Sequence, residues 1–125
     1  MRVPILKLGD ILLTSIQMDL TDSDAQQFQN DVLHMVHEKN AKGLIIDITA
    51  LDVVDSYMAR ILNDTAHMVR LLGAEVVLCG MRPAVAITLV EMGRELIGVD
   101  TALNLEQGME KLRRRIAGRP GAAGG

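Results

Sequence analysis

The chain has 125 residues, the length of one compact domain, and folding would remove about two-thirds of its surface from water. Apolar residues make up 49% and charged residues 23%, which excludes general disorder, and a net charge of −3 gives no overall case for binding nucleic acid or an anionic membrane. The single cysteine excludes an intrachain disulfide. No apolar run approaches the ~20 residues of a membrane span, and no signal-peptide core opens the chain. We therefore expect a cytoplasmic protein.

The first half of the chain predicts a hairpin, a helix and a buried strand. Two short apolar runs, 4–8 and 11–16, are separated by a Gly-Asp pair that favours a tight turn. Apolar residues then recur every three or four positions, as in an amphipathic helix: Ala25, Phe28, Val32, Met35 and Val36. Candidate caps for this helix are Thr21, Asp22 and Ser23. The nearly continuous apolar run 43–48 is typical of a strand that is covered on both faces.

The second half repeats this alternation of helix and buried strand. Helical spacing over 56–72 ends at Gly73, and a second buried strand covers 75–79. Pro83 suits the first turn of a helix that runs to about residue 92. A weakly signalled strand at 97–102 precedes a last helix, which begins at Asn104 and runs to about residue 116.

The order of these elements predicts the α/β class, with a mixed, mostly parallel sheet, an N-terminal β-hairpin at one edge and about four helices. We expect the folded domain to span 1–117, and the Gly/Ala-rich residues 118–125 to form a flexible tail.

The stretch around 45–56 carries the polar groups most suggestive of function. A buried strand ends at Asp47, and a loop with Asp52 and Asp55 leads to Ser56 at the start of a helix. Three carboxylates at the carboxyl end of a strand could serve metal-assisted phosphoryl transfer. Alternatively, Asp55 and Ser56 cap the helix. A hydroxyl at a helix start could also accept a phosphoryl group, whose charge the helix dipole would stabilise.

Two motifs resemble those of STAS domains, the fold of anti-sigma-factor antagonists. The first is IDITALDVVDS at 46–56, and the second is GAEVVLCGMRP at 73–83 with its Gly-x-x-Pro turn. The likeness covers about 3–116. Tyr57 and Met58 stand where many members continue with Ser-Gly, and this feature, with the helix at 83–91 and the ending at 101–108, is similar to the short single-domain scaffold proteins of the stressosome.

This resemblance implies a non-enzymatic phosphorylation switch. Ser56 matches the phosphoacceptor of the family, and the partner-binding residues would be Asp52, Asp55, Tyr57 and Met58. The partners implied are a serine/threonine switch kinase, STAS-domain sensor paralogues in a homo- and hetero-oligomer, and a phosphatase, all serving a stress-response sigma-factor pathway. No cofactor is implied. The alternatives are a free anti-anti-sigma factor that binds an anti-sigma kinase, and a metal-assisted enzyme that uses Asp47, Asp52 and Asp55.

Three other features have an ordinary structural interpretation beside a functional one. Thr88 lies where sensor subunits of these assemblies carry a second phosphorylated threonine, but a helical threonine commonly bonds back to a carbonyl. His34 and His37 have the i, i+3 spacing of metal ligands without an evident third ligand. The basic run 111–115 could contact nucleic acid, although cations in a last helical turn complement the helix dipole.

Overall fold

The computed structural model describes residues 2–93 and 99–119. Its elements in chain order are β1 (Ile5–Leu8), β2 (Ile11–Ser15), α1 (Asp22–Glu38), β3 (Gly43–Asp47), α2 (Ser56–Leu71), β4 (Glu75–Cys79), α3 (Pro83–Glu91), β5 (Asp100–Ala102) and α4 (Leu105–Ala117). The five-stranded sheet has the order β1-β2-β3-β4-β5; β1 and β2 are antiparallel, and every other neighbouring pair is parallel. The predicted α/β class, the mixed and mostly parallel sheet, the N-terminal hairpin and the four helices are confirmed.

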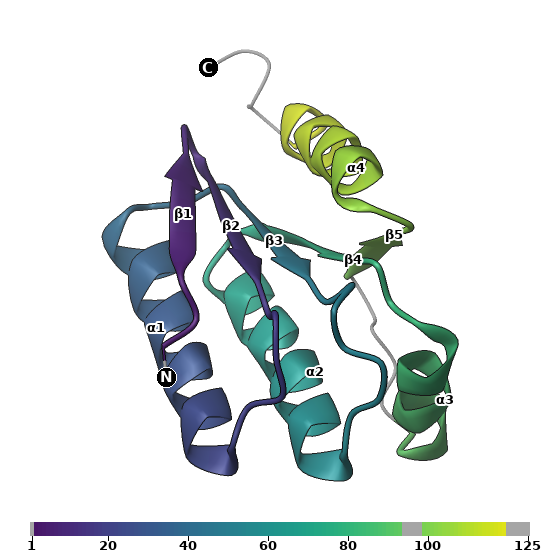
Figure 1. Cartoon of the computed structure of the whole chain (residues 1–125). Coiled ribbons are helices and arrows are strands. Elements are labelled where there is room, and N and C mark those ends of the chain that lie inside the picture. Colours follow the sequence, from purple (N-terminus) through teal and green to yellow (C-terminus); the bar gives the residue numbers. More distant parts are fainter. Residues whose placement is uncertain (1, 94–98, 120–125) are drawn as a thin grey trace.

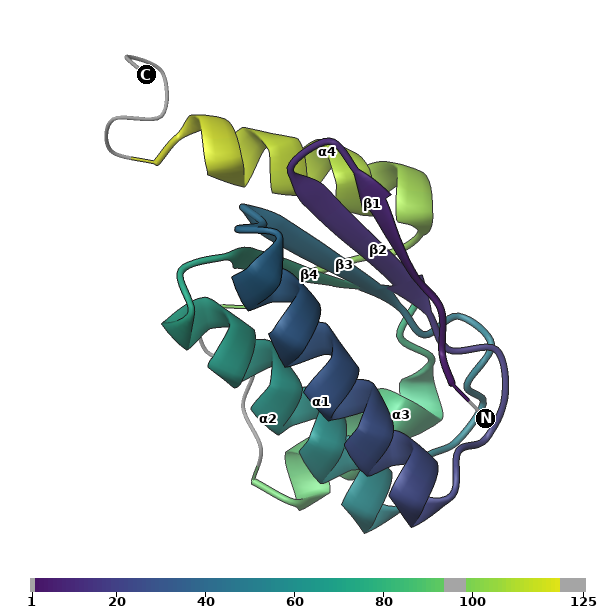
Figure 2. The same ribbon diagram turned by 90° about the vertical axis from the view of Figure 1, so that its left-hand side faces the viewer.

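Alternating side chains of the strands build two cores, one on each face of the sheet. Leu12, Leu44 and Leu78 point to the face that α1, α2 and α3 cover, within the larger core around Phe28. Ile45 and Val77 point to the opposite face, where they pack against Leu112. Helix α4 lies on this face of the sheet, across from α1, α2 and α3 (Figures 1 and 2). Because β3 and β4 are covered on both faces, their sequences are almost continuously apolar.

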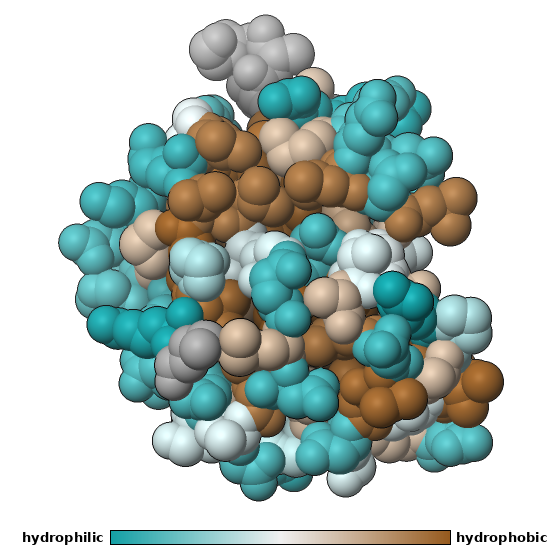
Figure 3. All heavy atoms as spheres, viewed as in Figure 1, coloured by the Kyte–Doolittle hydropathy of each residue, from teal (hydrophilic) through white to brown (hydrophobic). Residues whose placement is uncertain are grey.

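The two faces of the sheet are covered unequally. Helix α4 contacts β3, β4 and β5. On the α4 side of the hairpin, Ile11 of β2 is buried in the core with Leu112, whereas Leu6 and Leu8 of β1 are 57% and 46% exposed. Figure 3 shows the resulting apolar surface beside α4. No helix in the described part of the chain is long and apolar enough to cross a membrane.

The helices begin at caps that the sequence offers. Thr21 caps α1 by accepting a hydrogen bond from the backbone N–H of Asp24 at 3.0 Å, and Asn104 caps α4 by accepting one from Gln107 at 2.9 Å. Pro83 stands in the first turn of α3, as predicted. The strand expected at 97–102 is observed as β5, and residues 97 and 98 lie outside the described residues.

The last turn of α4 and the start of the tail are held by ion pairs on the half-buried carboxylate of Glu75. Its oxygens lie within 4 Å of guanidinium nitrogens of three arginines: Arg70, Arg115 and Arg119. Arg119 also donates to the backbone carbonyl of Gly73 at 2.6 Å. Of the tail expected at 118–125, residues 118 and 119 are described and the remaining residues lie outside the described part.

Candidate functional site at the carboxyl edge of the sheet

The candidate site lies where the parallel strands β2, β3 and β4 end. Parallel strands present their carboxyl ends at the same edge of a sheet, so the loops that follow them become neighbours. The three loops cover 16–21, 48–55 and 80–82, and they lead into α1, α2 and α3 respectively. The ends of the two sequence motifs, 46–56 and 73–83, therefore meet at one edge of the sheet.

The β3–α2 loop is fixed by its own side chains. The carboxylate of Asp47 accepts hydrogen bonds from the backbone N–H of Thr49 at 3.0 Å and from its hydroxyl at 2.6 Å. This arrangement turns the chain directly after β3. Leu51 is 2% exposed and anchors the middle of the loop in the core. The residues that follow Leu51 are thereby held at the rim of the sheet.

The β4–α3 turn supports this loop from the side. Arg82 donates from Nε to the carbonyl of Thr49 at 2.8 Å, and the same nitrogen lies 3.3 Å from the carboxylate of Asp52. Gly80 has φ +76°, and a Cβ built on it would lie 1.9 Å from Oγ1 of Thr49. Gly80 of the second motif is thus required for the close approach of the two loops.

Helix α2 begins with a division of roles between two adjacent residues. Asp55 is the N-cap, and its carboxylate accepts a hydrogen bond from the backbone N–H of Met58 at 2.8 Å. Ser56 is the first helical residue and is exposed to solvent. Because Asp55 supplies the cap, the Ser56 hydroxyl is not needed for it and stands at the rim, accessible to another protein.

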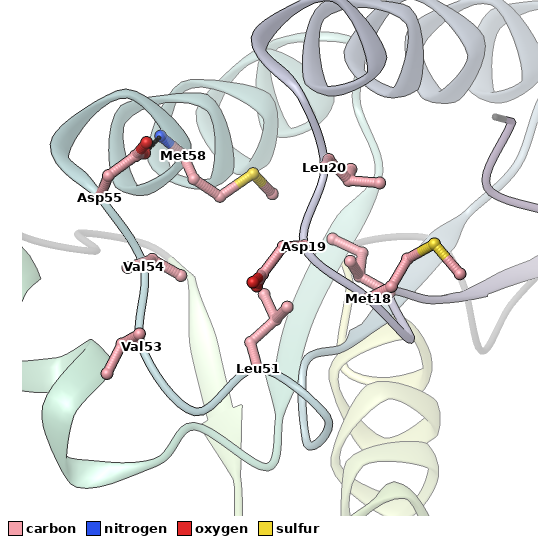
Figure 4. A pocket seen from close by; sticks show the side chains of 9 residues that line it. Met18, Asp19, Leu20, Leu51, Val53, Val54, Asp55 and Met58 are labelled. Atoms are coloured by element: carbon pink, nitrogen blue, oxygen red, sulfur yellow. Dashed lines mark hydrogen bonds between the residues drawn. The ribbon is translucent and has the colours of Figure 1, made fainter.

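A cavity of about 270 Å³ opens beside this helix start (Figure 4). It is lined by residues of the β2–α1 loop, the β3–α2 loop and the first turn of α2: Ile16, Met18, Asp19, Leu20, Leu51, Val53, Val54, Asp55 and Met58. Met58 is only 8% exposed, whereas Met18 and Val53 are 46% and 63% exposed. The site is therefore a hollow between apolar side chains that also carries the carboxylates of Asp19 and Asp55.

The aromatic ring at this edge belongs to Tyr57. It is half-buried and packs against the larger core, while the guanidinium carbon of Arg60 lies 5.9 Å from the ring centroid. A cation over an aromatic face at this distance makes a modest attractive contact. The sequence contains one tyrosine and no tryptophan, so Tyr57 is its only residue with strong near-ultraviolet absorption.

The predicted site residues are brought to one edge, but they differ in accessibility. Ser56, Asp52 and Asp55 are exposed, Tyr57 is half-buried, and Met58 is buried and lines the cavity. Sequence reasoning missed the part of the site that comes from the β2–α1 loop, above all Met18 and Asp19. The structure supplies the missing link, because β2 pairs in parallel with β3 and the loop after it therefore lies at the same edge.

The three carboxylates considered for metal-assisted chemistry each have a different protein partner. Asp47 binds Thr49, Asp52 pairs with Arg82, and Asp55 caps α2. Among residues 2–93 and 99–119, no three His, Cys, Asp or Glu side chains lie close enough to share a metal ion. His34 instead pairs with Glu38 at 2.8 Å on the exposed face of α1. The geometry gives the enzymatic alternative no support.

The remaining candidates take part in structural contacts. Thr88 is half-buried, and its hydroxyl donates to the carbonyl of Ala84 at 3.0 Å. In the basic run of α4, Lys111 donates to the carbonyl of Thr101 at 2.7 Å, and Arg115 pairs with both Glu75 and Asp100 at 3.5 Å. These cations hold α4 on the sheet.

One cysteine lies beneath this edge, at the end of β4. Burial, together with the nearby charge of Asp47, raises the pKa of the Cys79 thiol to about 11. A Cβ on Gly108 of α4 would lie 2.1 Å from the Cys79 sulfur, so helix and strand are in close contact there. The thiol is consequently neutral and enclosed.

Comparisons with known proteins agree with this architecture. The STAS domain family matches residues 2–107. RsbT co-antagonist protein RsbRA from Bacillus subtilis is 34% identical over 86 residues, which make up 69% of this chain but 31% of that protein. The structure of a serine-to-glutamate variant of RsbS from Moorella thermoacetica is 46% identical, covers 90% of this chain and 96% of that chain, and has a TM-score of 0.82. The unphosphorylated anti-sigma factor antagonist SpoIIAA is 12% identical over 90% of this chain and 96% of that chain, with a TM-score of 0.73, a likeness of fold alone.

Proposed function

Because this chain belongs to the STAS domain family, we propose that it is a phosphorylation-switch scaffold of a stressosome. In this proposal it assembles with copies of itself and with STAS-domain sensor paralogues, and it holds a serine/threonine switch kinase. Phosphorylation of Ser56 releases the kinase to act on a stress-response sigma-factor pathway, and a phosphatase resets the switch. The chain itself catalyses no reaction.

One observation carries this proposal: Ser56 is exposed and directly follows Asp55, which lines the cavity at the carboxyl edge of the sheet. A kinase can reach the hydroxyl, and a docked partner can contact the same rim. The proposal also draws support from the relatives. One is an RsbT co-antagonist, another matching structure is described as part of the molecular architecture of the stressosome, and the Moorella RsbS variant replaces a serine by glutamate.

The docking surface in this proposal combines apolar and acidic groups. Val53 and Met18 offer exposed apolar contact, and Asp19 and Asp55 add negative charge beside Ser56. A partner with a basic rim around an apolar side chain would complement this surface. A phosphoryl group adds a charge of about −1.5 to −2 at neutral pH, so it would place additional negative charge and a strongly hydrated group in the interface.

The energetic requirement on this switch is small. A loss of about 1.4 kcal/mol in binding free energy already lowers affinity tenfold. Placing a phosphate in a docked interface costs a few kcal/mol by desolvation and by repulsion from the neighbouring carboxylates. The modification can therefore release a partner without any change of fold.

The test is to incubate the purified chain with its cognate switch kinase and ATP, and to map the modified residue by peptide mass spectrometry. We expect one phosphoryl group on Ser56, and none in the variant Ser56→Ala. Phosphate on Thr88 or Ser23 instead of Ser56 would contradict the proposal. Light scattering with and without sensor paralogues distinguishes the alternative: a chain that stays monomeric with these paralogues would be a free anti-anti-sigma factor.

A further inference from the structure

Two arginines lie near the start of α2, and they differ in the groups that they contact. Arg82 is held by the carbonyl of Thr49 and the carboxylate of Asp52. Arg60, one helical turn after Ser56, is exposed and contacts the ring of Tyr57. Within residues 2–93 and 99–119, Arg60 takes part in no ion pair.

The helix places Ser56 and Arg60 side by side. Residues four apart on an α-helix have Cβ atoms about 5–6 Å from each other, on the same face. Tyr57, three residues before Arg60, is a neighbour on that face as well. The guanidinium can therefore leave the Tyr57 ring and reach a group on Ser56 by changing side-chain torsions alone.

Because the guanidinium fork matches phosphate oxygens, we infer that Arg60 receives the phosphoryl group on Ser56 and gives up its contact with Tyr57. This inference rests on the proposed function, since it concerns the modified state of the same serine. No bond is made or broken in the step. A weak cation–ring contact is exchanged for an ion pair between helix neighbours.

Among the described residues, the other charged groups considered at this edge already have partners, which leaves Arg60 as the available cation. Asp55 is the carboxylate beside Ser56, and it accepts a hydrogen bond from the Met58 N–H. Asp52 keeps Arg82 engaged at 3.3 Å. Asp64, one turn beyond Arg60, is half-buried and has contacts of its own.

This exchange has a consequence for docking. Phosphorylation would change two features of the rim at once, by adding the phosphate to Ser56 and by uncovering the ring of Tyr57. The pairing would also neutralise part of the new charge within the chain, so a partner that docks at this rim meets an ion pair rather than an isolated dianion.

The experiment uses the full chain with phosphoserine genetically encoded at position 56, and follows the phosphate by ³¹P NMR titration. An opposite charge favours the dianion, so removing Arg60 should raise the second pKa of the phosphate. An exposed i, i+4 pair predicts that Arg60→Gln raises it by about 0.2 to 0.4. The variant Arg60→Lys should retain part of the effect.

A matched control is Arg113→Gln, which removes the same charge from an exposed residue of α4. Arg113 lines a hollow with Asp10 and Lys42, at the opposite edge of the sheet from Ser56. Equal phosphate pKa values in the Arg60→Gln and Arg113→Gln proteins would overturn the inference. It would also be overturned if the phosphate pKa rose in the Arg82→Gln protein and not in the Arg60→Gln protein. Far-UV circular dichroism checks that each variant is folded.

The outcome is separable from that of the proposed function. The phosphate is encoded rather than enzymatically added, so the titration gives an answer whether or not a kinase modifies Ser56. Conversely, phosphate mapping with the kinase gives its answer whether or not Arg60 binds the product.

Discussion

Replacing Gly80 by alanine tests whether the two sequence motifs are braced against each other. Two costs add at this position: an alanine in the left-handed region loses about 1 kcal/mol, and a methyl group forced into packed atoms loses a further 1–3 kcal/mol. The overlap arises because the new Cβ would lie 1.9 Å from Oγ1 of Thr49. We therefore expect Gly80→Ala to lower the free energy of unfolding by about 2–4 kcal/mol.

Thermal denaturation followed by far-UV circular dichroism measures this loss. An unfolding entropy of about 2.1 cal/mol/K per residue converts it into a fall in Tm of roughly 8–15 °C. The control is Gly9→Ala, because Gly9 has a similar φ of +63° but no atom within 4 Å of a Cβ. It should lose only the backbone cost, about 1 kcal/mol. Equal losses in the two variants would refute the close contact between the loops.

Three further predictions concern the helix start, the clamp on α4 and the buried thiol. Asp55→Ala should destabilise the chain by about 1 kcal/mol in urea unfolding, whereas Asp55→Asn, which keeps a capping oxygen, should lose only a few tenths. Glu75→Gln should cost about 1–2 kcal/mol in the same assay by weakening its three arginine contacts, and Glu110→Gln, from an exposed pair, should cost less than about 0.5 kcal/mol. Because the folded-state pKa of Cys79, about 11, exceeds the ~8.5 of an unfolded cysteine, the unfolded chain loses its proton first as pH rises. Between about pH 8.5 and 11, wild type should therefore lose more stability than Cys79→Ala, and parallel losses would exclude this linkage.

The secondary structure was predictable where periodicity and local chemistry point the same way. Ala25, Phe28 and Val32 mark the buried stripe of α1, and the apolar runs of β3 and β4 predict strands that are covered on both faces. The last strand carried a weaker signal because only three residues, Asp100–Ala102, pair with β4, and none of them is fully buried. The cap of α2 could be placed at Asp55 or Ser56 from sequence, and side-chain geometry was needed to choose Asp55.

The candidate site was predictable in its location but not in its shape. The order of strands brings the ends of β2 and β3 together, yet a cavity depends on how loop side chains pack. Met58 illustrates this point: the family resemblance implied a partner contact there, while the structure leaves it 8% exposed in the wall of the cavity. Met18 and Asp19 lie nearly 40 residues before Ser56 in the sequence, so local patterns gave no reason to join them to the site.

The central claim is that phosphorylation of Ser56 controls a docked kinase. The most direct test measures, by isothermal titration calorimetry, the affinity of the cognate switch kinase for three variants. Ser56→Ala should bind as tightly as the unmodified chain, and Ser56→Asp should bind at least tenfold more weakly, a loss of about 1.4 kcal/mol or more. Ser23→Asp, which adds the same charge to the first turn of α1, should bind like wild type. Equal affinities of Ser56→Ala and Ser56→Asp would contradict the account.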